Sequence, residues 1–280
     1  MNLHSTTVKL LDLPFYTEGP CVDDAGNLFF TTLSGGQVWR MRPGEAPVIW
    51  AEAVCPNGQL IMAKGSHWVC DSAEGGIVQF DHTGSRTGEL LSRQCSGLTV
   101  HCPNDLIEDR YGNVFFTDSV RESGRVFKLG KDGAQQCIAG GLDYPNGLAL
   151  SPDHSLLYVA ESYQNRILAI PLNEKQLSPA WVWAKLPRHR SGRPVDNLPD
   201  GLATDAQGRV WVAHYGMQAI QVLSPEGRLL ASLDTALPLT SNLCFVSDHR
   251  HRKSVLITGG YAEPGPGAVL MMTVDFEGAL

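Results

Sequence analysis

The stretch Pro145-Asn146-Gly147-Leu148-Ala149-Leu150 places a tight turn directly before an apolar strand, and the same arrangement occurs six times along the chain. The other copies are Glu18-Gly19-Pro20, Pro56-Asn57-Gly58, Pro103-Asn104-Asp105, Pro199-Asp200-Gly201 and Ser241-Asn242-Leu243. One position in every copy carries a side chain with an oxygen atom: Glu18, Asn57, Asn104, Asn146, Asp200 and Asn242. A position that holds an oxygen donor in six repeats predicts that these side chains meet at one shared site.

Two further strands follow each copy of the motif. The second strand is strongly apolar, as in Val114-Phe115-Phe116-Thr117, and the third follows a short polar break, as in Arg125-Val126-Phe127. Turns such as Asp132-Gly133 come next, and residues of these types tolerate the positive φ angles of hairpins. Successive oxygen-bearing residues are 39, 47, 42, 54 and 42 positions apart. Periods of about 40 to 50 residues with four short strands are typical of β-propeller blades.

We therefore predict an all-β protein in which one domain, residues 1–280, forms a six-bladed β-propeller with four-stranded antiparallel blades around a central channel. Val8-Lys9-Leu10-Leu11 precedes the first motif, and we expect it to close the ring by joining the last blade. A β-sandwich or a pair of small barrels is the alternative for alternating apolar strands. The fixed order of strands within each repeat argues against both.

Composition limits the classes of partner. The net charge of −7 disfavours nucleic acid, because phosphate binding requires a basic face. No apolar run approaches the roughly 20 residues that cross a membrane, and Met1-Asn2-Leu3-His4-Ser5 lacks the layout of a secretion signal. The seven cysteines show no CxxC spacing and are typical of reduced thiols. We expect a cytoplasmic protein, monomeric or weakly homo-oligomeric, that binds neither nucleic acid nor membranes.

The motif side chains have the chemistry of a metal site. In a propeller, the turn that enters each innermost strand lies at one mouth of the channel, so the six residues should form a ring there. Two carboxylates and several amide oxygens facing one another would repel without a cation, and hard divalent ions prefer such ligands. Asn and Asp also form turns before strands without binding anything, but Glu18 is no turn former. We predict one divalent cation, with Ca²⁺ favoured and Zn²⁺, Mn²⁺ or Mg²⁺ as alternatives.

These residues also resemble those of a known family. Over nearly its whole length, the chain looks like the senescence-marker/gluconolactonase/regucalcin-like group of six-bladed propellers. The resemblance is carried by Glu18-Gly19-Pro20, Pro103-Asn104-Asp105, Gly112-Asn113-Val114-Phe115-Phe116-Thr117-Asp118, Pro145-Asn146-Gly147-Leu148-Ala149-Leu150-Ser151 and Pro199-Asp200-Gly201-Leu202-Ala203. It implies that the metal is held by Glu18, Asn104, Asn146 and Asp200. It also implies that Asn57 and Asn242 contact substrate or bound water.

The resemblance implies hydrolysis of sugar lactones, with one departure. Members of the regucalcin type often carry an Arg two residues before the Asn of the third motif, where this chain has Cys102, so the favoured sugar stays open. A family Glu that contacts substrate corresponds to Glu122, which could equally be a solvated loop residue. Tyr163 and His214 each follow a second strand and are expected substrate contacts. The cluster Arg188-His189-Arg190 is predicted to be solvated loop charge. The alternative is that it overhangs the site and attracts an anionic substrate, because it lies in the longest segment between motifs, before Asp200.

We expect a metal-dependent hydrolase that opens a sugar or similarly hydroxylated lactone, as gluconolactonases do. The metal would polarise the lactone carbonyl, and either Asp200 as general base or a metal-bound water would drive the attack. Two alternatives stay open: a phosphotriesterase-like hydrolase of the diisopropyl-fluorophosphatase type, which would prefer apolar pocket walls, and a non-catalytic metal-binding propeller scaffold. The sequence contains no Gly-x-Ser-x-Gly elbow, no Walker loop and no His-Glu-x-x-His.

Overall fold

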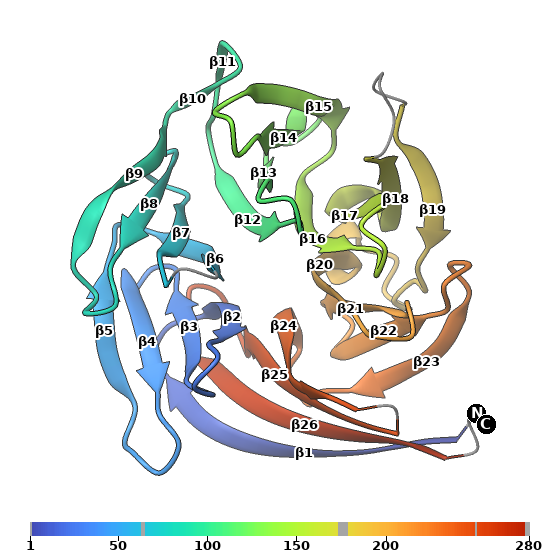
Figure 1. Ribbon diagram of the computed structural model, residues 1–280. Coiled ribbons are helices and arrows are strands. Elements are labelled where there is room, and N and C mark those ends of the chain that lie inside the picture. Colours follow the sequence, from blue (N-terminus) through green and yellow to red (C-terminus); the bar gives the residue numbers. More distant parts are fainter. Residues whose placement is uncertain (1, 63–64, 173–178, 250, 278–280) are drawn as a thin grey trace.

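Six four-stranded antiparallel sheets surround a common axis (Figure 1). The computed structural model of the chain describes residues 2–62, 65–172, 179–249 and 251–277. In five sheets the strand nearest the axis is followed outward by the next three strands in chain order, and in the sixth the outermost strand is β1 (Asn2–Leu13). The prediction of an all-β, six-bladed propeller is therefore confirmed, and the sandwich and barrel alternatives are wrong.

The first half of the chain forms three blades, each with its strands in order from the axis outward. The first blade contains β2 (Thr17–Val22), β3 (Leu28–Thr32), β4 (Gln37–Met41) and β5 (Val48–Glu52). The second contains β6 (Pro56–Ile61), β7 (His67–Asp71), β8 (Gly76–Phe80) and β9 (Arg86–Ser92). The third contains β12 (Pro103–Glu108), β13 (Val114–Asp118), β14 (Gly124–Leu129) and β15 (Gln135–Leu142).

The second half of the chain repeats this order. The fourth blade contains β16 (Pro145–Leu150), β17 (Leu156–Glu161), β18 (Arg166–Pro171) and β19 (Trp181–Lys185). The fifth contains β20 (Leu198–Thr204), β21 (Val210–Tyr215), β22 (Ala219–Leu223) and β23 (Leu229–Asp234). The sixth contains β24 (Leu239–Asp248), β25 (Arg252–Gly260), β26 (Gly267–Glu277) and β1 (Asn2–Leu13). Connections hold a small hairpin, β10 (Gln94–Cys95) with β11 (Leu98–Thr99), and two single turns of 3₁₀ helix, η1 (Ser162–Gln164) and η2 (Pro194–Asp196).

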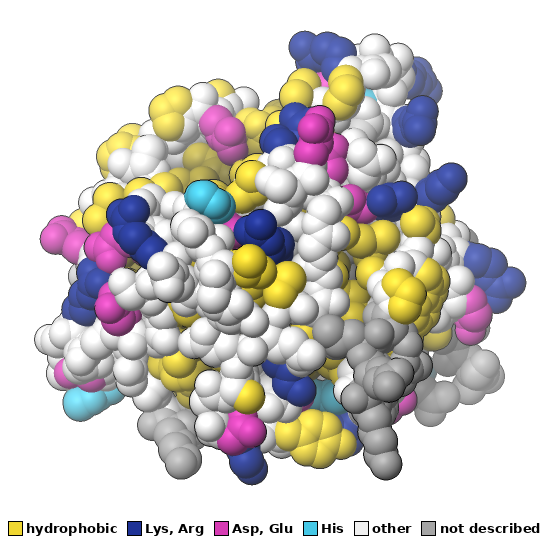
Figure 2. All heavy atoms as spheres, turned by 90° about the horizontal axis from the view of Figure 1, so that it is seen from above, with side chains coloured by type: hydrophobic (Ala, Val, Ile, Leu, Met, Phe, Trp, Pro, Cys, Tyr) yellow, Lys and Arg dark blue, Asp and Glu magenta, His cyan; other side chains and the backbone are white. Residues whose placement is uncertain are grey.

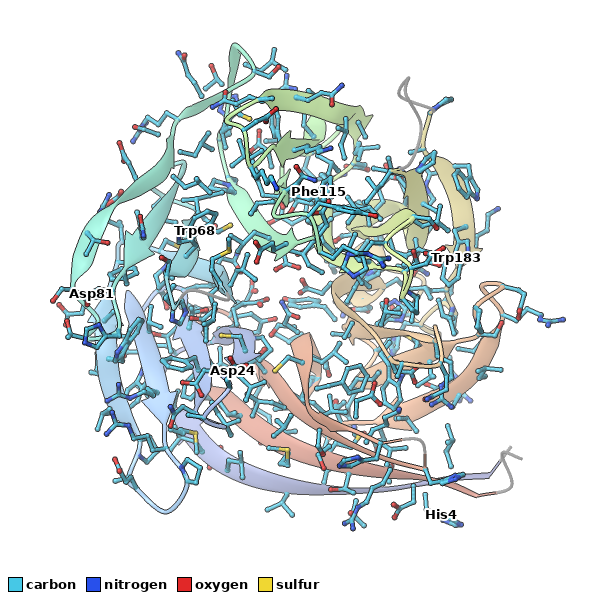
Figure 3. All side chains as sticks on the ribbon, viewed as in Figure 1. His4, Asp24, Trp68, Asp81, Phe115 and Trp183 are labelled. Carbon is cyan, nitrogen blue, oxygen red and sulfur yellow. The ribbon has the colours of Figure 1, made fainter. Side chains whose placement is uncertain are left out.

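Apolar strands form the core between neighbouring blades. Every residue of β13 is buried, because a strand inside a blade packs against a sheet on each of its faces. One core cluster combines Phe115 and Val126 of the third blade with Leu157 and Val159 of the fourth. Figure 3 shows Phe115 inside the ring and Trp183 near its outer side. This two-sided burial explains why the second strand of each repeat reads as a continuous apolar run.

The first strand of the chain closes the ring. β1 pairs antiparallel with β26, from Asn2 opposite Glu277 to Leu13 opposite Gly267, so the sixth blade is built from both ends of the chain. Figure 1 shows β1 along the outer edge of this blade. The closure predicted for residues 8–11 is confirmed and extends over the whole of β1.

The antiparallel order fixes which segments surround each mouth of the channel. The start of each innermost strand, the loop between second and third strands, and the connection between blades all lie at one end, which we call the upper mouth. The hairpin turns between first and second strands and between third and fourth strands lie at the lower mouth. The six motifs therefore share the upper mouth with loops and connections from every blade.

The exterior carries mixed charge. Figure 2 shows the rim of the ring, where Lys and Arg side chains are interspersed with Asp and Glu. Among the described residues, no helix is long and apolar enough to cross a membrane. All seven cysteines lie in the described part of the chain, and none of them forms a disulfide.

Glycines let the innermost strands approach one another at the axis. A Cβ atom added to Gly147 would lie 2.6 Å from the Gly201 Cα atom and 2.7 Å from the Leu202 nitrogen of the next blade. A Cβ added to Gly201 would lie 2.6 Å from the Asn242 Cα atom in the blade after that. Real side chains do not tolerate such distances, so the motif needs glycine here because the next blade's backbone occupies the space.

The variant Gly147→Ala tests this close approach. We expect it to lower the free energy of unfolding by about 1–3 kcal/mol, because the backbone that it meets belongs to a packed strand. Urea unfolding measures the change. The control is Gly88→Ala in β9, where an added Cβ would meet only the tip of the Gln79 side chain at 3.9 Å. We expect the control to change stability by less than about 0.5 kcal/mol, and equal effects of the two variants would contradict the close-packing account.

Candidate functional site

A β-bulge begins the innermost strand of each of the first five blades at the motif. In the third blade Pro103 pairs with Asp118 and Leu106 pairs with Phe116, so three steps along β12 match two along β13. The corresponding irregularities begin at Glu18, Pro56, Pro145 and Pro199. A bulge bends its strand and re-aims side chains, which frees the motif residues from the regular alternation of the sheet.

The re-aimed side chains meet in a cavity of about 300 Å³ at the upper mouth, which we call the upper cavity. Five of the six motif residues line it: Glu18, Asn57, Asn104, Asn146 and Asp200. All five are buried, with exposed fractions between 5% and 8%. Because they come from five different blades, the closed ring assembles this set, and no local segment of sequence could do so.

Hydroxyl groups of several blades hold the backbone of the next motif in place. Thr31 donates a hydrogen bond of 2.9 Å to the carbonyl of Asn57. Thr117 donates one of 2.9 Å to the carbonyl of Asn146. Ser162 donates one of 2.7 Å to the carbonyl of Pro199, next to Asp200. These buried bonds pass from blade to blade, so the positions of the motif side chains depend on one another.

The two motif carboxyls are electrostatically strained. Burial raises the pKa of Glu18 to about 8, opposed by a hydrogen bond of 2.9 Å from the Gly19 N–H and increased by the charge of Asp105. Burial likewise raises the pKa of Asp200 well above its usual value, and Glu18 adds to the rise. The hydrogen bond between Asn146 and Asp200 opposes it. The chain therefore buries two like charges beside each other, and none of the described residues that line the cavity is basic.

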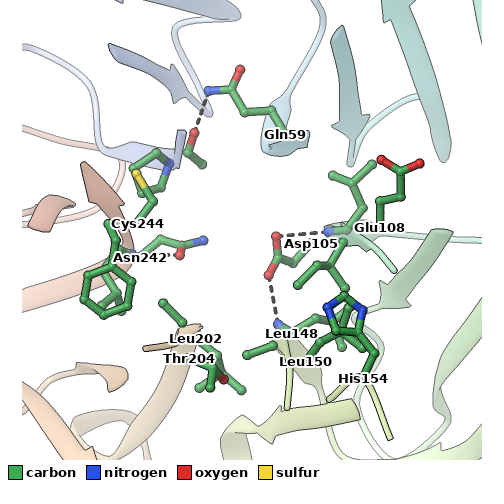
Figure 4. Close-up of a pocket in the computed structure, with 18 residues that line it drawn as sticks. Gln59, Asp105, Glu108, Leu148, Leu150, His154, Leu202, Thr204, Asn242 and Cys244 are labelled. Carbon is green, nitrogen blue, oxygen red and sulfur yellow. Dashed lines mark hydrogen bonds between the residues drawn. The ribbon is translucent and has the colours of Figure 1, made fainter. Parts of the chain in front are cut away.

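A second cavity, of about 310 Å³, lies below the ring; we call it the lower cavity, and Figure 4 shows its lining. Asp105 projects into it and accepts hydrogen bonds of 2.9 Å from the N–H groups of Leu106 and Leu148. Burial raises the pKa of Asp105 to about 6, and these two bonds oppose the rise. Asp105 thus links the third blade to the fourth directly beneath the motif ring, a role that the sequence did not predict.

Asn242 departs from the expectation that all six motif residues line one mouth. It lines the lower cavity together with Asp105 (Figure 4). The cause is the position of the bulge in the sixth blade, which falls at Ser241, so that Asn242 pairs regularly with Thr258. Its side chain hydrogen-bonds with Glu18 from that side. The expected substrate contact of Asn242 is therefore placed on the far side of the ring from the upper cavity.

His214 takes a strand-end position that other blades fill with acids. His214 pairs with Pro199 in the motif of the fifth blade. Asp118 and Glu161 hold the equivalent positions in the third and fourth blades, where each pairs with the proline of its motif. The carboxylates of Asp118 and Glu161 accept hydrogen bonds from backbone N–H groups just before those motifs. His214 is fully buried, and burial lowers its pKa to about 3, opposed by the Asn197 backbone. It does not line the upper cavity, and the equivalence indicates a structural role.

The structure separates the other two expected substrate contacts. Tyr163 lines the upper cavity, and the Arg121 guanidinium lies over its ring at 3.5 Å from the centroid. Arg121 also donates a hydrogen bond of 2.6 Å to Asp143. Glu122 is exposed, is not part of the cavity wall, and uses its backbone N–H to bind Asp143. Tyr163 thus comes to the site, whereas Glu122 stays in the loop beside it.

The long segment before Asp200 reaches the site through apolar residues. Val195 and Leu198 line the upper cavity, so this segment contributes to its wall. The basic cluster at residues 188–190 is not part of the wall. Arg193 is engaged with Asp196, to which it donates bonds of 2.8 and 2.9 Å.

Four ionisable residues of the upper cavity were not predicted from the sequence: Tyr16, Tyr144, Tyr215 and Glu263. Tyr16 and Tyr144 each lie two positions before an oxygen-bearing motif residue, the same place that Cys102 holds in the third blade. Glu263 follows the second strand of its blade, as Tyr163 does in the fourth. A search of every blade at these two positions, two residues before the motif side chain and just after the second strand, would have identified Tyr16, Tyr144 and Glu263.

A larger hollow exists elsewhere, but it does not contain the motif. It has a volume of about 580 Å³ and lies at the turns of the first and second blades, between Asp24, Trp50 and His82. None of the six oxygen-bearing motif residues, all of which the structure describes, lines it. The motif side chains therefore single out the upper cavity as the candidate site.

Known gluconolactonases resemble the chain in sequence and in fold. A gluconolactonase from Zymomonas mobilis is 31% identical to this chain over 219 residues. The matched residues cover 68% of this chain and 57% of that protein, so the chain spans less than two thirds of this relative. A solved gluconolactonase from Xanthomonas campestris has a TM-score of 0.81 at 26% identity, with 96% of this chain and 90% of that chain covered. A calcium-binding regucalcin from Agrobacterium tumefaciens has a TM-score of 0.74 at 18% identity. The match covers 94% of this chain and 93% of the regucalcin chain, and it shows a shared fold alone.

A family model also matches most of the chain. It is described as the SMP-30/Gluconolactonase/LRE-like region and matches residues 16–258, well over half of the chain. This range includes all six motifs and excludes the ring-closing strand β1. The chain therefore belongs to the SMP-30/gluconolactonase/LRE-like family.

Proposed function

We propose that this protein is a metal-dependent lactonase whose upper cavity opens a sugar lactone or a similarly hydroxylated lactone. Glu18, Asn104, Asn146 and Asp200 would hold one divalent cation, with Ca²⁺ favoured. The observation that carries the proposal is the burial of two carboxyls with three amide side chains at one point on the axis. The names of the Zymomonas and Xanthomonas relatives support the substrate class.

The donor chemistry fits a hard cation. Glu18 and Asp200 supply two negative charges, and Asn104 and Asn146 supply neutral oxygens, a mixture that Ca²⁺ accepts in irregular geometry. In the described residues there is no group of three or more His, Cys, Asp or Glu side chains that could hold a metal, so the proposed site depends on two carboxyls together with neutral amide oxygens. The described residues that line the upper cavity include neither Cys nor His, the ligands typical of zinc sites. The Oδ1 atom of Asn57 is buried without a hydrogen-bond partner in the described part of the chain, which leaves another oxygen directed at the same space.

Each of the residues at the site would have a separate role in the reaction. When bound, the cation would polarise the lactone carbonyl and stabilise negative charge on its oxygen. Asp200 would accept a proton from the attacking water, and the Asn146 side chain would hold its carboxylate in place. The Gly19 N–H would fix the orientation of Glu18. Tyr163, pinned under Arg121, would form part of the wall against which a sugar ring packs.

The phosphotriesterase-like alternative keeps one supporting observation. Leu33, Val195 and Leu198 line the upper cavity, and a phosphotriester would favour such apolar contacts. Two polar residues that were expected to favour a sugar, His214 and Asn242, are not in this wall. Four tyrosines and Glu263 are, and they offer hydroxyl and carboxyl groups to a hydroxylated substrate. We therefore retain the lactone as the proposed substrate.

Activity measurements test the proposal. Hydrolysis of glucono-δ-lactone, followed by proton release, should vanish after chelation and return with one ion of a panel of calcium, zinc, manganese and magnesium. Asp200→Asn should lower kcat/KM by at least about 100-fold, because it removes one ligand charge and the proton acceptor. The control is Asp24→Asn on an exposed turn, which should leave kcat/KM within about twofold. Hydrolysis that survives chelation would overturn the metal dependence, and normal turnover by Asp200→Asn with its metal bound would exclude Asp200 as the base.

Stability measurements test the charge arrangement independently of turnover. Glu18 has a folded-state pKa of about 8, above its ordinary value of 4.5. The folded protein therefore binds this proton more tightly than the unfolded chain does. The stability that the bound proton contributes is fully present below pH 4.5 and is lost as the pH rises through about 8. Asp200→Asn removes the neighbouring charge, so in excess chelator it should be more stable than the wild type, by on the order of 2 kcal/mol at about pH 8 and by less at about pH 5.

Urea unfolding at the two pH values measures this difference. Saturating calcium should reverse the order, because an ion that binds only the folded wild type adds to its stability by mass action. A variant that is less stable than the wild type in chelator at both pH values would contradict the account of buried repulsion.

A further inference from the structure

Tyr16 is a buried tyrosine whose hydroxyl group has no partner. The side chain is 2% exposed, and its hydroxyl makes no hydrogen bond within the described part of the chain. It lines the upper cavity in the connection between β1 and β2, two residues before Glu18. An unpaired buried donor costs about 1–3 kcal/mol, so its presence in the wall of a cavity calls for a ligand atom that it can bind.

The sixth blade holds the Tyr16 ring in a fixed socket. The Tyr16 N–H donates a hydrogen bond of 2.8 Å to the Pro264 carbonyl. A Cβ atom added to Gly260 would lie 2.8 Å from the Tyr16 Cδ2 atom, so the ring packs directly on glycine backbone. The following residue, Thr17, donates bonds of 3.0 and 2.7 Å to the carbonyls of Gly259 and Ala268. The hydroxyl therefore occupies one position before any substrate arrives.

Tyr16 lines the upper cavity together with Glu18, Asp200, Tyr215 and Glu263. Asp200 and Glu18 are the charged groups that act on its hydroxyl most strongly, followed by Glu263, and Tyr215 contacts the ring edge-on at 6.3 Å between centroids. A phenol keeps its proton at neutral pH, so the Tyr16 hydroxyl is available as a hydrogen-bond donor. Because Tyr16 lines the same cavity as Glu18 and Asp200, this donor shares a wall with the carboxyls that would hold a cation.

We propose that the Tyr16 hydroxyl donates a hydrogen bond to the lactone oxygen that gains negative charge during hydrolysis, which makes Tyr16 a further catalytic residue. This inference rests on the lactonase function proposed above. The hydrogen bond strengthens as charge develops on the acceptor, so it stabilises the transition state more than the bound substrate. Its loss should therefore appear in kcat and leave KM little changed.

Tyr16→Phe tests the proposal, because it removes the hydroxyl oxygen and preserves the ring. In the metal-loaded protein we expect kcat for glucono-δ-lactone to fall about 10- to 100-fold, with KM within about twofold. The melting temperature of the metal-free variant should equal or exceed that of the wild type, because the variant loses an unpaired buried donor. The matched control is Tyr158→Phe, which removes a hydroxyl from a tyrosine that is 4% exposed and lies outside the cavity, and which should change neither kinetic constant.

The outcomes separate this inference from the proposed function. A wild-type protein that hydrolyses the lactone, together with a Tyr16→Phe variant that keeps kcat within about twofold, would overturn the role of Tyr16 alone. A melting temperature lowered by more than about 3 °C in Tyr16→Phe would assign the hydroxyl a structural role and also overturn it. A wild type that hydrolyses no lactone with any ion of the panel would overturn the proposed function and this inference with it.

Discussion

The close approach of the innermost strands at the axis is the constraint on which the rest of the structure depends. The backbone of one motif leaves no room for a side chain on the preceding blade, as Gly147 against Gly201 and Gly201 against Asn242 demonstrate. Hydroxyls of several blades then bond to carbonyls of the next motif, as Thr31 does with Asn57. A fold packed in this way has few positions at which a side chain can point along the channel, and the bulged motifs supply them.

The consequence of that arrangement is concentrated charge. Glu18, Asp105, Asp200 and Glu263 surround the axis, and burial raises the pKa of each. Two backbone N–H groups satisfy Asp105, so its carboxyl serves as a bridge between blades. Glu18 is hydrogen-bonded by the Gly19 N–H and the Asn242 side chain, and Asp200 by the Asn146 side chain, yet burial still raises the pKa of both carboxyls and Glu18 adds to the rise at Asp200. The burial of these two carboxyls in one cavity is the physical reason for assigning them to a cation. Buried like charges are typical of sites where stability is given up for function.

Local, repeated signals made the blades predictable from the sequence. Apolar second strands such as Val114–Asp118 and the motif spacing identify each blade without knowledge of its neighbours, and the strand before the first motif was expected to close the ring. Five of the six motif residues reached the upper cavity for the same reason. The exception is Asn242, whose position depends on a β-bulge at Ser241. No residue type in this segment predicts where that bulge falls.

Side chains outside the motif were harder to predict, because their roles depend on contacts between blades. His214 occupies the same strand position as Glu161, but only the paired register shows that it replaces a backbone-binding acid. Tyr16 enters the cavity from a connection whose course is set by the sixth blade, at the opposite end of the sequence. Glu122 has a favourable residue type and place, yet it is exposed and lies outside the cavity wall.

Metal stoichiometry tests the central claim most directly. The wild type and a Glu18→Gln, Asp200→Asn double variant would be dialysed to equilibrium against calcium, and the bound metal would be determined by elemental analysis. We predict one ion per wild-type chain and none above the buffer level in the double variant, because the variant keeps the shape of the ring and loses both of its charges. A wild type without bound metal, or a double variant that retains one ion per chain, would contradict the assignment of the motif ring to a cation.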